Sequence, residues 1–402
     1  MNPEAQRCLL CRRPFCREAC PVKTDVPTYM ALYREGKLQE AREGLFRNNP
    51  FSAVTCQVCD YQQFCYGHCV LNKKKLAIRW YEIERELSMP YILEGNPSVP
   101  VGEPTGKRVA IVGAGPAGIT AALKLRELGH DVVMYDAMPL PGGVLRYGIP
   151  SFRLDDKYVD AYSALMQKAG VQFHGSVRVG KDLPLEDIRR DNDAVILCAG
   201  AWVPRKLKVP GEDGNPSVIY ALDYLADPSS YKLGHRVLVI GGGNVTMDAS
   251  RTAVRSGHDT TVVYRKTFEN MPAGYEEVQG AKSDGVKFMV FSVPVAMRIQ
   301  ETDEGEKYFT TVRRCENYYR EDGTIATKMI EGSDTEIPYD TMIVAISERP
   351  DGSILGGASL DDMKDVFICG DYKTGPATVV EAVKGAKESV AETDAFLRGE
   401  SL

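Results

Sequence analysis

The chain has 402 residues, of which 44% are hydrophobic and 26% charged, with a formal net charge of -6. This length allows about three modules, and the acidic balance argues against a nucleic-acid partner. No apolar run is long enough to cross a membrane, and the charged residues from Met1 to Arg13 lack the apolar stretch of a secretory signal. We therefore expect a cytoplasmic protein with no membrane partner.

Cysteines are concentrated near the start of the chain. Eight of the eleven lie between Cys8 and Cys69, in the runs CLLCRRPFCREACP and CQVCDYQQFCYGHC. Disulfides would need an oxidising compartment, which the absence of a signal argues against. A zinc ion could be bound by Cys8, Cys11, Cys56 and Cys59, because two CxxC pairs suit a tetrahedral site. That site leaves four cysteines unexplained unless a second zinc ion is added.

Iron-sulfur clusters account for more of this pattern. The first run is close to the ferredoxin pattern CxxCxxCxxxCP, in which the fourth cysteine binds a different cluster from the first three. Here the middle gap has four residues instead of two. On this pattern Cys8, Cys11 and Cys16 hold one cluster, while Cys20, just before Pro21, reaches a second. We expect two 4Fe-4S clusters in a helical domain.

A nucleotide-binding signature follows. RVAIVGAGPAG predicts a strand, a GxGxxG turn at Gly113, Gly115 and Gly118, and the start of a helix; DVVMYDA predicts a second strand that ends at Asp136. The glycines allow a tight turn and close approach to a pyrophosphate at the helix N-terminus, and the acid binds the ribose hydroxyls. The turn-rich LPGGVLRYGIPSFRL that follows is suited to wrap the rest of FAD.

A second signature lies at RVLVIGGGNVTMDASRTAVRSGHDTTVVYRK. Gly241 and Gly243 hold the first two glycine positions, while Thr246 replaces the third small residue and should loosen helix-to-strand packing slightly. The second strand ends at Arg265 and Lys266 instead of an acid. Bases at this point suit a 2'-phosphate, which favours NADP(H) over NAD(H). The alternative is that two basic residues merely solvate a strand end.

Two dinucleotide folds in one chain normally mean one flavin and one nicotinamide. VFICGD and the helix ATVVEAVKGAKESVAETDAFL read as the return of the first fold, so the second fold is an insertion. Asp371 would meet the ribityl or pyrophosphate region, and Thr378 begins a helix whose positive end suits the flavin pyrimidine. We thus expect an α/β protein with two Rossmann-like domains, the second inserted in the first. The expected parts are a helical iron-sulfur domain over residues 1–100, an FAD domain over 101–232 and 342–402, and an NAD(P)H domain over 233–341, with EGNPSVPVGEPTGK as linker.

With these motifs, essentially the whole chain resembles the small (beta) subunit of bacterial glutamate synthase and its relatives. These include the flavin subunit of dihydropyrimidine dehydrogenase and the large subunit of NADH-dependent ferredoxin:NADP oxidoreductase. GAGPAG, PGGVLRYGIPSFRL, GGGNVTMDA, VVYRKTFENMPA and ICGDYKTGPATVVEA occur in the family's order. The resemblance implies a flavoprotein that takes hydride from NAD(P)H onto FAD. It would pass single electrons through two clusters to a larger catalytic subunit or a ferredoxin, in either direction, within a hetero-oligomer.

The resemblance also implies cluster ligands. One cluster would be held by Cys8, Cys11, Cys16 and Cys69, and three corners of the other by Cys20, Cys59 and Cys65. The family's remaining ligand is a Gln or Glu in the next helix. We expect Glu82, with Glu84 as the alternative register; Cys56 is then a spare thiol, although by counting it could be the eighth ligand.

The same resemblance implies the nucleotide sites. Around FAD it places Pro116, Ala117, Gly118, Asp136, Gly142, Gly143, Val144, Arg153, Gly370, Asp371 and Thr378. Around the nicotinamide nucleotide it places Gly243, Asn244, Val245 and Arg265. We expect no catalytic acid or base, because hydride transfer needs none.

The chain departs from the family in a few places. Asp136 stands where Glu is frequent, and Asp60 stands where Pro is usual, which is expected to loosen the turn after Cys59. ISERP replaces IGQxP, so that Ser347 and Glu348 alter a loop beside the cofactors.

Two other classes of function stay open. A stand-alone disulfide reductase of the thioredoxin reductase type needs a redox CxxC in the nucleotide domain, whereas Cys198, Cys315 and Cys369 are isolated in sequence. A non-catalytic, cluster-bearing assembly subunit is the other class, and the intact glycines argue against it.

One basic run, Lys73 to Lys75, follows the last clustered cysteine. We interpret it as a solvated turn, with docking of an acidic carrier such as a ferredoxin as the alternative.

Overall fold

The computed structural model describes residues 2–94, 97, 99–303 and 305–400. The chain forms two compact units. Unit 1 comprises Met1–Arg146, Ser151–Val203 and Arg349–Leu402, and unit 2 comprises Tyr147–Pro150 and Pro204–Glu348. Of the predicted linker, Gly95, Asn96 and Ser98 lie outside the described residues. No helix in the described part of the chain is long and apolar enough to cross a membrane.

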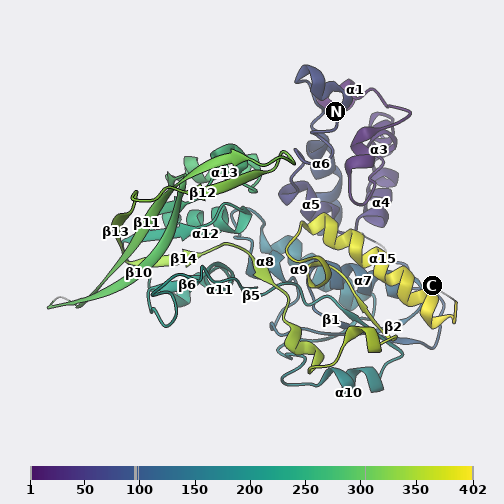
Figure 1. The fold of residues 1–402 in the computed structure, drawn as a ribbon. Coiled ribbons are helices and arrows are strands. Elements are labelled where there is room, and N and C mark those ends of the chain that lie inside the picture. Colours follow the sequence, from purple (N-terminus) through teal and green to yellow (C-terminus); the bar gives the residue numbers. More distant parts are fainter. Residues whose placement is uncertain (1, 95–96, 98, 304, 401–402) are drawn as a thin grey trace. The chain divides into compact units, whose positions relative to one another are not determined.

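The N-terminal part of unit 1 is helical (Figure 1). Its helices are α1 (Pro3–Arg7), α2 (Phe15–Ala19), α3 (Val26–Arg34), α4 (Leu38–Asn48), α5 (Ser52–Val58), η1 (Val70–Lys74) and α6 (Trp80–Leu93). Met30, Leu45, Ile83 and Leu87 form a fully buried centre between the longer helices. The short helices instead end at cysteines: Cys8, Cys20 and Cys59 cap α1, α2 and α5 in extended conformation.

The remainder of unit 1 is a parallel sheet of order β16-β4-β1-β2-β3. Its elements are β1 (Arg108–Val112), α7 (Pro116–Glu127), β2 (Asp131–Tyr135), α8 (Val144–Tyr147), α9 (Asp156–Lys168), β3 (Gln172–His174), α10 (Leu185–Arg190), β4 (Ala194–Leu197), η4 (Gly352–Leu355), η5 (Leu360–Asp362), β16 (Val366–Ile368), α14 (Asp371–Thr374) and α15 (Val379–Leu397). The strand cores are apolar throughout because helices cover both faces. α15 packs along α7, so the end of the chain returns to the first nucleotide fold, as predicted (Figure 1).

The helical part is joined to this sheet domain by buried contacts within unit 1. Phe51 stacks on Tyr162 of α9 with ring centroids 4.1 Å apart. The Tyr162 hydroxyl donates to the Pro50 carbonyl at 2.7 Å, and Lys387 Nζ of α15 donates to the Asn48 carbonyl at 3.1 Å. These contacts hold the cysteine-bearing helices against α9 and α15.

Unit 2 has a parallel sheet of order β6-β14-β7-β8-β9 and an antiparallel sheet built on β11. Its elements are β6 (Val218–Tyr220), α11 (Ala221–Ala226), η2 (Pro228–Ser230), β7 (Arg236–Ile240), α12 (Asn244–Arg255), β8 (Asp259–Val263), η3 (Phe268–Asn270), α13 (Tyr275–Ser283), β9 (Lys287–Met289), β10 (Ser292–Thr302), β11 (Gly305–Tyr319), β12 (Ile325–Met329), β13 (Thr335–Tyr339) and β14 (Thr341–Val344). Where the chain passes between the units, β5 (Val203–Pro204) pairs with β15 (Glu348–Arg349). In this sheet Met342 of β14 pairs with Val218 of β6 on one side and with Leu238 of β7 on the other. The sheet of unit 2 therefore includes β6 and most of β14, which lie outside the range 233–341 that was predicted for the NAD(P)H domain.

Candidate functional site

Five cysteines line one cavity in the helical part of unit 1. Four of them, Cys8, Cys11, Cys16 and Cys69, are those that the family resemblance assigns to one cluster, and the fifth is Cys65. Cys8 caps α1, Cys16 lies in the first turn of α2, and Cys69 precedes η1. The walls are apolar and include Val26, Ile78 and Trp80.

The thiols that line this cavity are suitable ligands for the positively charged irons of a cluster. Burial raises the pKa of Cys16 to about 12, and its neighbours Cys69, Cys8 and Cys11 act in the same direction. Thiols gathered in an apolar cavity ionise poorly by themselves, whereas thiolates are the ligands that iron-sulfur clusters need. The donor set therefore fits a cluster, whose positive irons would offset the charge of the thiolates.

A second group contains Cys20, Cys59, Cys65 and Glu84. Burial raises the pKa of Cys59 and of Cys65, and Cys20 and Glu84 lie close enough to both thiols to raise it further. Cys20 is the C-cap of α2 and Cys59 that of α5, while Glu84 projects from α6. Three separate segments thus supply this group.

The structure places Glu84, and not the expected Glu82, beside these cysteines. Glu84 is buried, burial raises its pKa to about 8, and the Trp80 side chain donates a hydrogen bond to it. The Glu82 carboxylate instead lies 3.1 Å from the Arg79 guanidinium and is partly exposed. Residues two apart on an α-helix point about 200° apart, so only one of the two carboxylates can face the cysteines.

Cys56 does not join either group. It is buried in α5, its thiol donates to the Ala53 carbonyl at 3.4 Å, and its charged neighbours are Glu84 and Arg85. The zinc alternative from the sequence combined Cys56 and Cys59 with two cysteines that here line the separate cavity. Within the described ranges, no three His, Cys, Asp or Glu side chains converge closely enough to bind a single metal ion.

The FAD signature forms a turn that only glycine can fill. Gly113 has φ +108°, and a Cβ added to Gly118 would lie 1.9 Å from the Gly113 carbonyl oxygen. A Cβ on Gly143 would lie 2.7 Å from Gly115 Cα, so LPGG runs directly against the glycine turn. Pro116 and Ala117 begin α7, Val144 begins α8, and Arg153 lies in the loop before α9. This backbone surface fits a pyrophosphate at the start of α7.

Asp136 closes this turn at the end of β2. Its carboxylate accepts from Ala114 N at 2.6 Å and from Met138 N at 2.7 Å. Burial raises its pKa, and these two backbone hydrogen bonds act against the rise. The side chain is thus fixed in the position that binds ribose hydroxyls in this fold.

The closing segment meets the same turn. A Cβ on Gly370 would lie 2.9 Å from Ala117 Cβ, and φ +60° suits glycine there. Asp371 Oδ1 accepts from Ala377 N at 3.2 Å. Thr378 caps α15 through a capping box with Glu381, which fixes the start of that helix.

The second signature, in unit 2, has a close-packed turn. Gly241 has φ +150°, and a Cβ there would lie 2.2 Å from the Ala345 carbonyl oxygen. Thr246 is fully buried and its hydroxyl donates to the same oxygen at 3.2 Å. The Thr246 hydroxyl therefore makes a hydrogen bond at the point where the sequence predicted looser packing of the helix against the strand. Gly243, the N-cap of α12, has open space beside it, as a phosphate-binding glycine needs.

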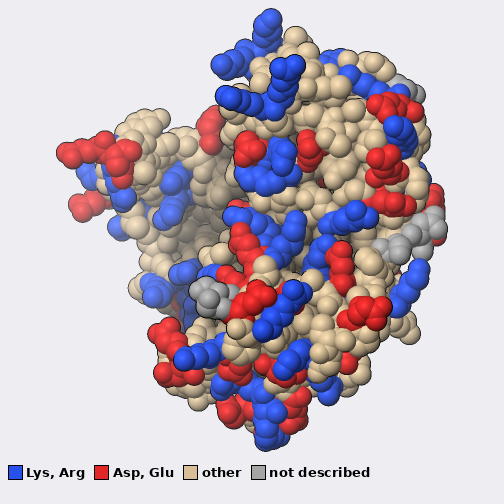
Figure 2. All heavy atoms as spheres, turned by 90° about the vertical axis from the view of Figure 1, so that its right-hand side faces the viewer, with Lys and Arg blue, Asp and Glu red and all other residues tan. Residues whose placement is uncertain are grey.

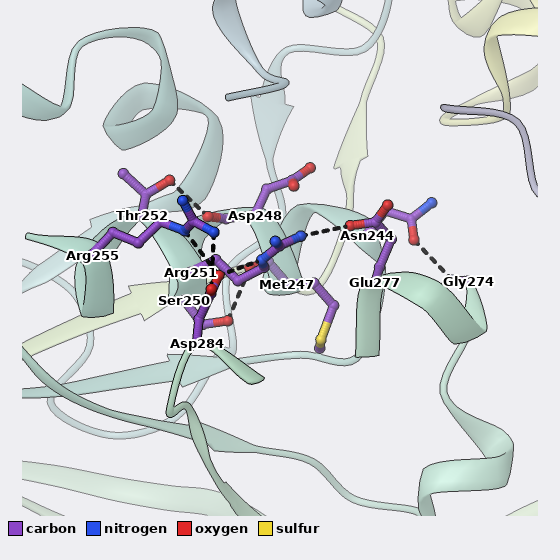
Figure 3. Close-up of polar contacts among 10 residues, drawn as sticks. All are labelled: Asn244, Met247, Asp248, Ser250, Arg251, Thr252, Arg255, Gly274, Glu277 and Asp284. Carbon is purple, nitrogen blue, oxygen red and sulfur yellow. Dashed lines mark hydrogen bonds and ion pairs between the residues drawn. The ribbon is translucent and has the colours of Figure 1, made fainter. Parts of the chain in front are cut away.

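A network of arginines and carboxylates holds α12 to α13 (Figure 3). Asp284 accepts from Arg251 Nε at 2.8 Å and from Arg255 Nη2 at 2.9 Å, while Arg251 Nη1 reaches Glu277 at 3.1 Å. At the start of α12, which continues with Val245, Asn244 Oδ1 accepts from Gly274 N at 2.9 Å. Sequence reasoning missed this network, although the spacing of the two arginines places them on one face of the helix.

The two basic residues at the end of β8 differ. Arg265 is exposed and makes no ion pair with any residue that the structure describes. Lys266 Nζ donates to the Ile325 carbonyl at 3.2 Å. Arg265 is therefore better placed to receive a phosphate than Lys266.

Cys198 and Cys369, isolated in sequence, are neighbours in the fold. They follow β4 and β16, which pair directly, and a hydrogen bond between the two thiols raises the pKa of Cys198 together with burial. The Cys198 thiol also lies 3.4 Å from the Gly113 carbonyl. This buried pair packs beneath the FAD turn and does not supply the CxxC that a disulfide reductase carries in its nucleotide domain.

Comparison with known proteins agrees with this geometry. Residues 1–90 match the dihydropyrimidine dehydrogenase domain II, 4Fe-4S cluster family, and residues 107–386 match the pyridine nucleotide-disulphide oxidoreductase family. The glutamate synthase [NADPH] small chain of Halomonas elongata is 34% identical over 86% of this chain and 76% of its own length. That of Azospirillum brasilense is 30% identical over the whole chain and 90% of its own length.

Among solved structures, Mycobacterium tuberculosis FprA in complex with NADPH shares the fold, with a TM-score of 0.59 at 20% identity. The similarity covers 74% of this chain and 86% of FprA. The chain is an NADPH-dependent flavoprotein oxidoreductase with an iron-sulfur domain, and it belongs to the glutamate synthase small-chain family.

Proposed function

We propose that this chain is the electron-entry subunit of a larger enzyme. It would oxidise NADPH and deliver the electrons one at a time, through two 4Fe-4S clusters, to a larger catalytic subunit or a ferredoxin-type carrier. The observation that carries the proposal is the gathering of seven cysteines and Glu84 into two adjoining groups, with Cys65 next to both, in the part of unit 1 that packs against the FAD fold. The small-chain names of the relatives support a larger partner.

The residues that would hold each group follow from the contacts above. The first cluster would be bound by Cys8, Cys11, Cys16 and Cys69, and the second by Cys20, Cys59, Cys65 and Glu84. The turn from Gly113 to Gly118, Asp136 and the closing segment would bind FAD; Gly243, Asn244 and Arg265 would bind NADPH. When bound, FAD accepts hydride and the clusters conduct single electrons, so the protein needs only to position them.

The order of the two groups follows from their neighbours. Lys387 of α15 donates to the Asn48 carbonyl, and Cys20 lies close enough to Lys387 to act on its pKa, which burial lowers. The second group therefore lies on the side of the FAD fold. The cavity of the first group is bordered by Leu9 and Phe15, which are both exposed. Electrons would enter at the second group and leave at the first.

Anaerobic titration of the purified chain with NADPH tests the proposal. We expect about eight irons and eight labile sulfides per FAD, flavin bleaching, and then an electron paramagnetic resonance signal from reduced clusters. A protein with only four irons, or one whose flavin bleaches while the clusters stay oxidised, would contradict it.

A further inference from the structure

The mouth of the cysteine-lined cavity carries exposed apolar side chains. Leu9 and Phe15 both line this cavity, yet 61% and 60% of their surfaces are exposed. Each lies between cysteines of the first group in the sequence. Adjoining large apolar side chains that stay in water are typical of a surface that another protein covers.

Unpaired cations belong to the same two segments that line the cavity. They are Arg12 and Arg13, between Cys11 and Cys16, and the run from Lys73 to Lys75, which follows the lining residues Val70 and Leu71. All five cations are exposed, and none forms an ion pair within the described part of the chain. Slightly farther along, Arg17 and Lys23 are paired with carboxylates.

Acidic side chains are missing from the same two segments. Residues 8–16 and 61–81 contain no Asp or Glu, although the chain as a whole has a net charge of -6. Figure 2 shows Lys and Arg side chains gathered at the top of the view, which is the end of unit 1 that the N-terminal helices form in Figure 1. The two segments that supply most of the cavity lining therefore carry only positive charge, on a protein that is acidic as a whole.

We propose that this cavity rim, made of Leu9, Phe15, Arg12, Arg13 and Lys73 to Lys75, is the docking surface for an acidic iron-sulfur carrier protein of the ferredoxin type. The inference rests on the proposed function, since it places electron exit at the first cluster. An apolar centre within a charged border is the anatomy of protein interfaces, and complementary charge accelerates encounter. In each cycle one NADPH would become NADP+ and release one proton, while two carrier molecules each accept one electron.

The test is the rate at which the full chain, with its cofactors, reduces a bacterial two-cluster ferredoxin. The variant K73E/K74E reverses two rim charges several residues away from Cys69. We expect its second-order rate constant at low ionic strength to fall about tenfold, and the dependence on salt to become shallower. The control K168E/K181E makes the same net charge change at two exposed lysines of the sheet domain, at the end of α9 and in the loop after β3, outside the two segments that carry the rim; its rate constant should stay within about twofold of wild type.

Two comparisons separate docking from other effects. Mitochondrial cytochrome c is a basic acceptor, so K73E/K74E should not slow its reduction. Iron content and NADPH-driven flavin bleaching should match the wild type in both variants. Equal slowing with both acceptors, equal slowing in both variants, or wild-type binding to phosphatidylserine vesicles without a salt-dependent reaction with ferredoxin would overturn the inference.

Failure of the proposed function gives a different result. If NADPH does not reduce the flavin, the chain can be reduced with dithionite, freed of excess reductant by gel filtration and mixed with ferredoxin. A rim that docks the carrier still gives a salt-dependent rate that K73E/K74E lowers. If the rate of ferredoxin reduction changes neither with salt nor in K73E/K74E, docking at this rim is refuted, whether or not NADPH is the donor.

Discussion

Replacing Glu84 by Ala should remove the second cluster and leave the first. Glu84 is the buried carboxylate that lies beside Cys59 and Cys65, and it is the proposed fourth corner of that group. Without it, one iron of the cluster keeps no protein ligand, since the Cys56 thiol is directed to the Ala53 carbonyl. Iron content should therefore fall from about eight to about four per FAD, a loss of one cluster of two.

Two matched variants make this loss specific. Glu82→Ala removes a carboxylate from the same helix, but that side chain pairs with Arg79 at a partly exposed site, where an ion pair contributes little to stability. Cys56→Ser tests the thiol that counting alone would make the eighth ligand. Both variants should keep about eight irons and the same electron paramagnetic resonance signals as wild type.

Iron, labile sulfide and FAD are measured on protein purified without oxygen. If Glu84→Ala keeps eight irons while Glu82→Ala loses four, the ligand face of α6 is the opposite of the one inferred here. If Cys56→Ser loses four, the thiol and not the carboxylate closes the second group. Mild disruption of both clusters in all three variants would mean that the array does not divide as proposed.

Further predictions concern the nucleotide folds. Ser347 has φ +112°, a backbone angle that favours glycine, and the family has Gly at this position. Ser347→Gly should therefore raise the free energy of unfolding by about 1 kcal/mol, measured by thermal unfolding. The control Ser353→Gly, in the short helix η4, should lower the free energy of unfolding. Gly118→Ala would place a Cβ 1.9 Å from the Gly113 oxygen, so FAD content should fall sharply while iron content stays; full FAD occupancy would contradict the close packing. Arg265→Gln should raise KM for NADPH about tenfold or more and leave KM for NADH unchanged; equal effects on both nucleotides would argue against a 2'-phosphate contact.

Much of the fold could be predicted from short patterns in the sequence. The glycines at Gly113 and Gly118 need a turn whose geometry only glycine permits, so strand, turn and helix could be predicted together. The first three cysteines of the cavity lie within nine residues of each other, and short spacing of this kind restricts how they can be arranged. The return of the closing segment to the first nucleotide fold could be predicted from its motif, and in the structure its helix α15 packs along α7.

Other features depend on contacts that sequence spacing does not contain. The choice between Glu82 and Glu84 depends on the rotation of α6, which Trp80 and its buried neighbours set. Thr246 is accommodated because Ala345, almost a hundred residues later, offers it a carbonyl. β6 has three residues, too few for a hydrophobic pattern, and only its pairing with β14 assigns it to unit 2.

The two cysteine groups are adjoining, which makes one more consequence testable. Cys16 lies within α2 and Cys20 caps its end, so four residues of helix, about 6 Å, separate their backbones. Cys65 lies near enough to Cys16 and Cys20 for both to raise the pKa of its thiol. Because we propose that the second group lies beside the FAD fold, Glu84→Ala should leave the first cluster assembled but cut off from NADPH. NADPH should then bleach the flavin of this variant without reducing the remaining cluster, while dithionite reduces it. If NADPH reduced the remaining cluster as fast as in wild type, electrons would not need to pass the second group, and the order of the path proposed here would be wrong.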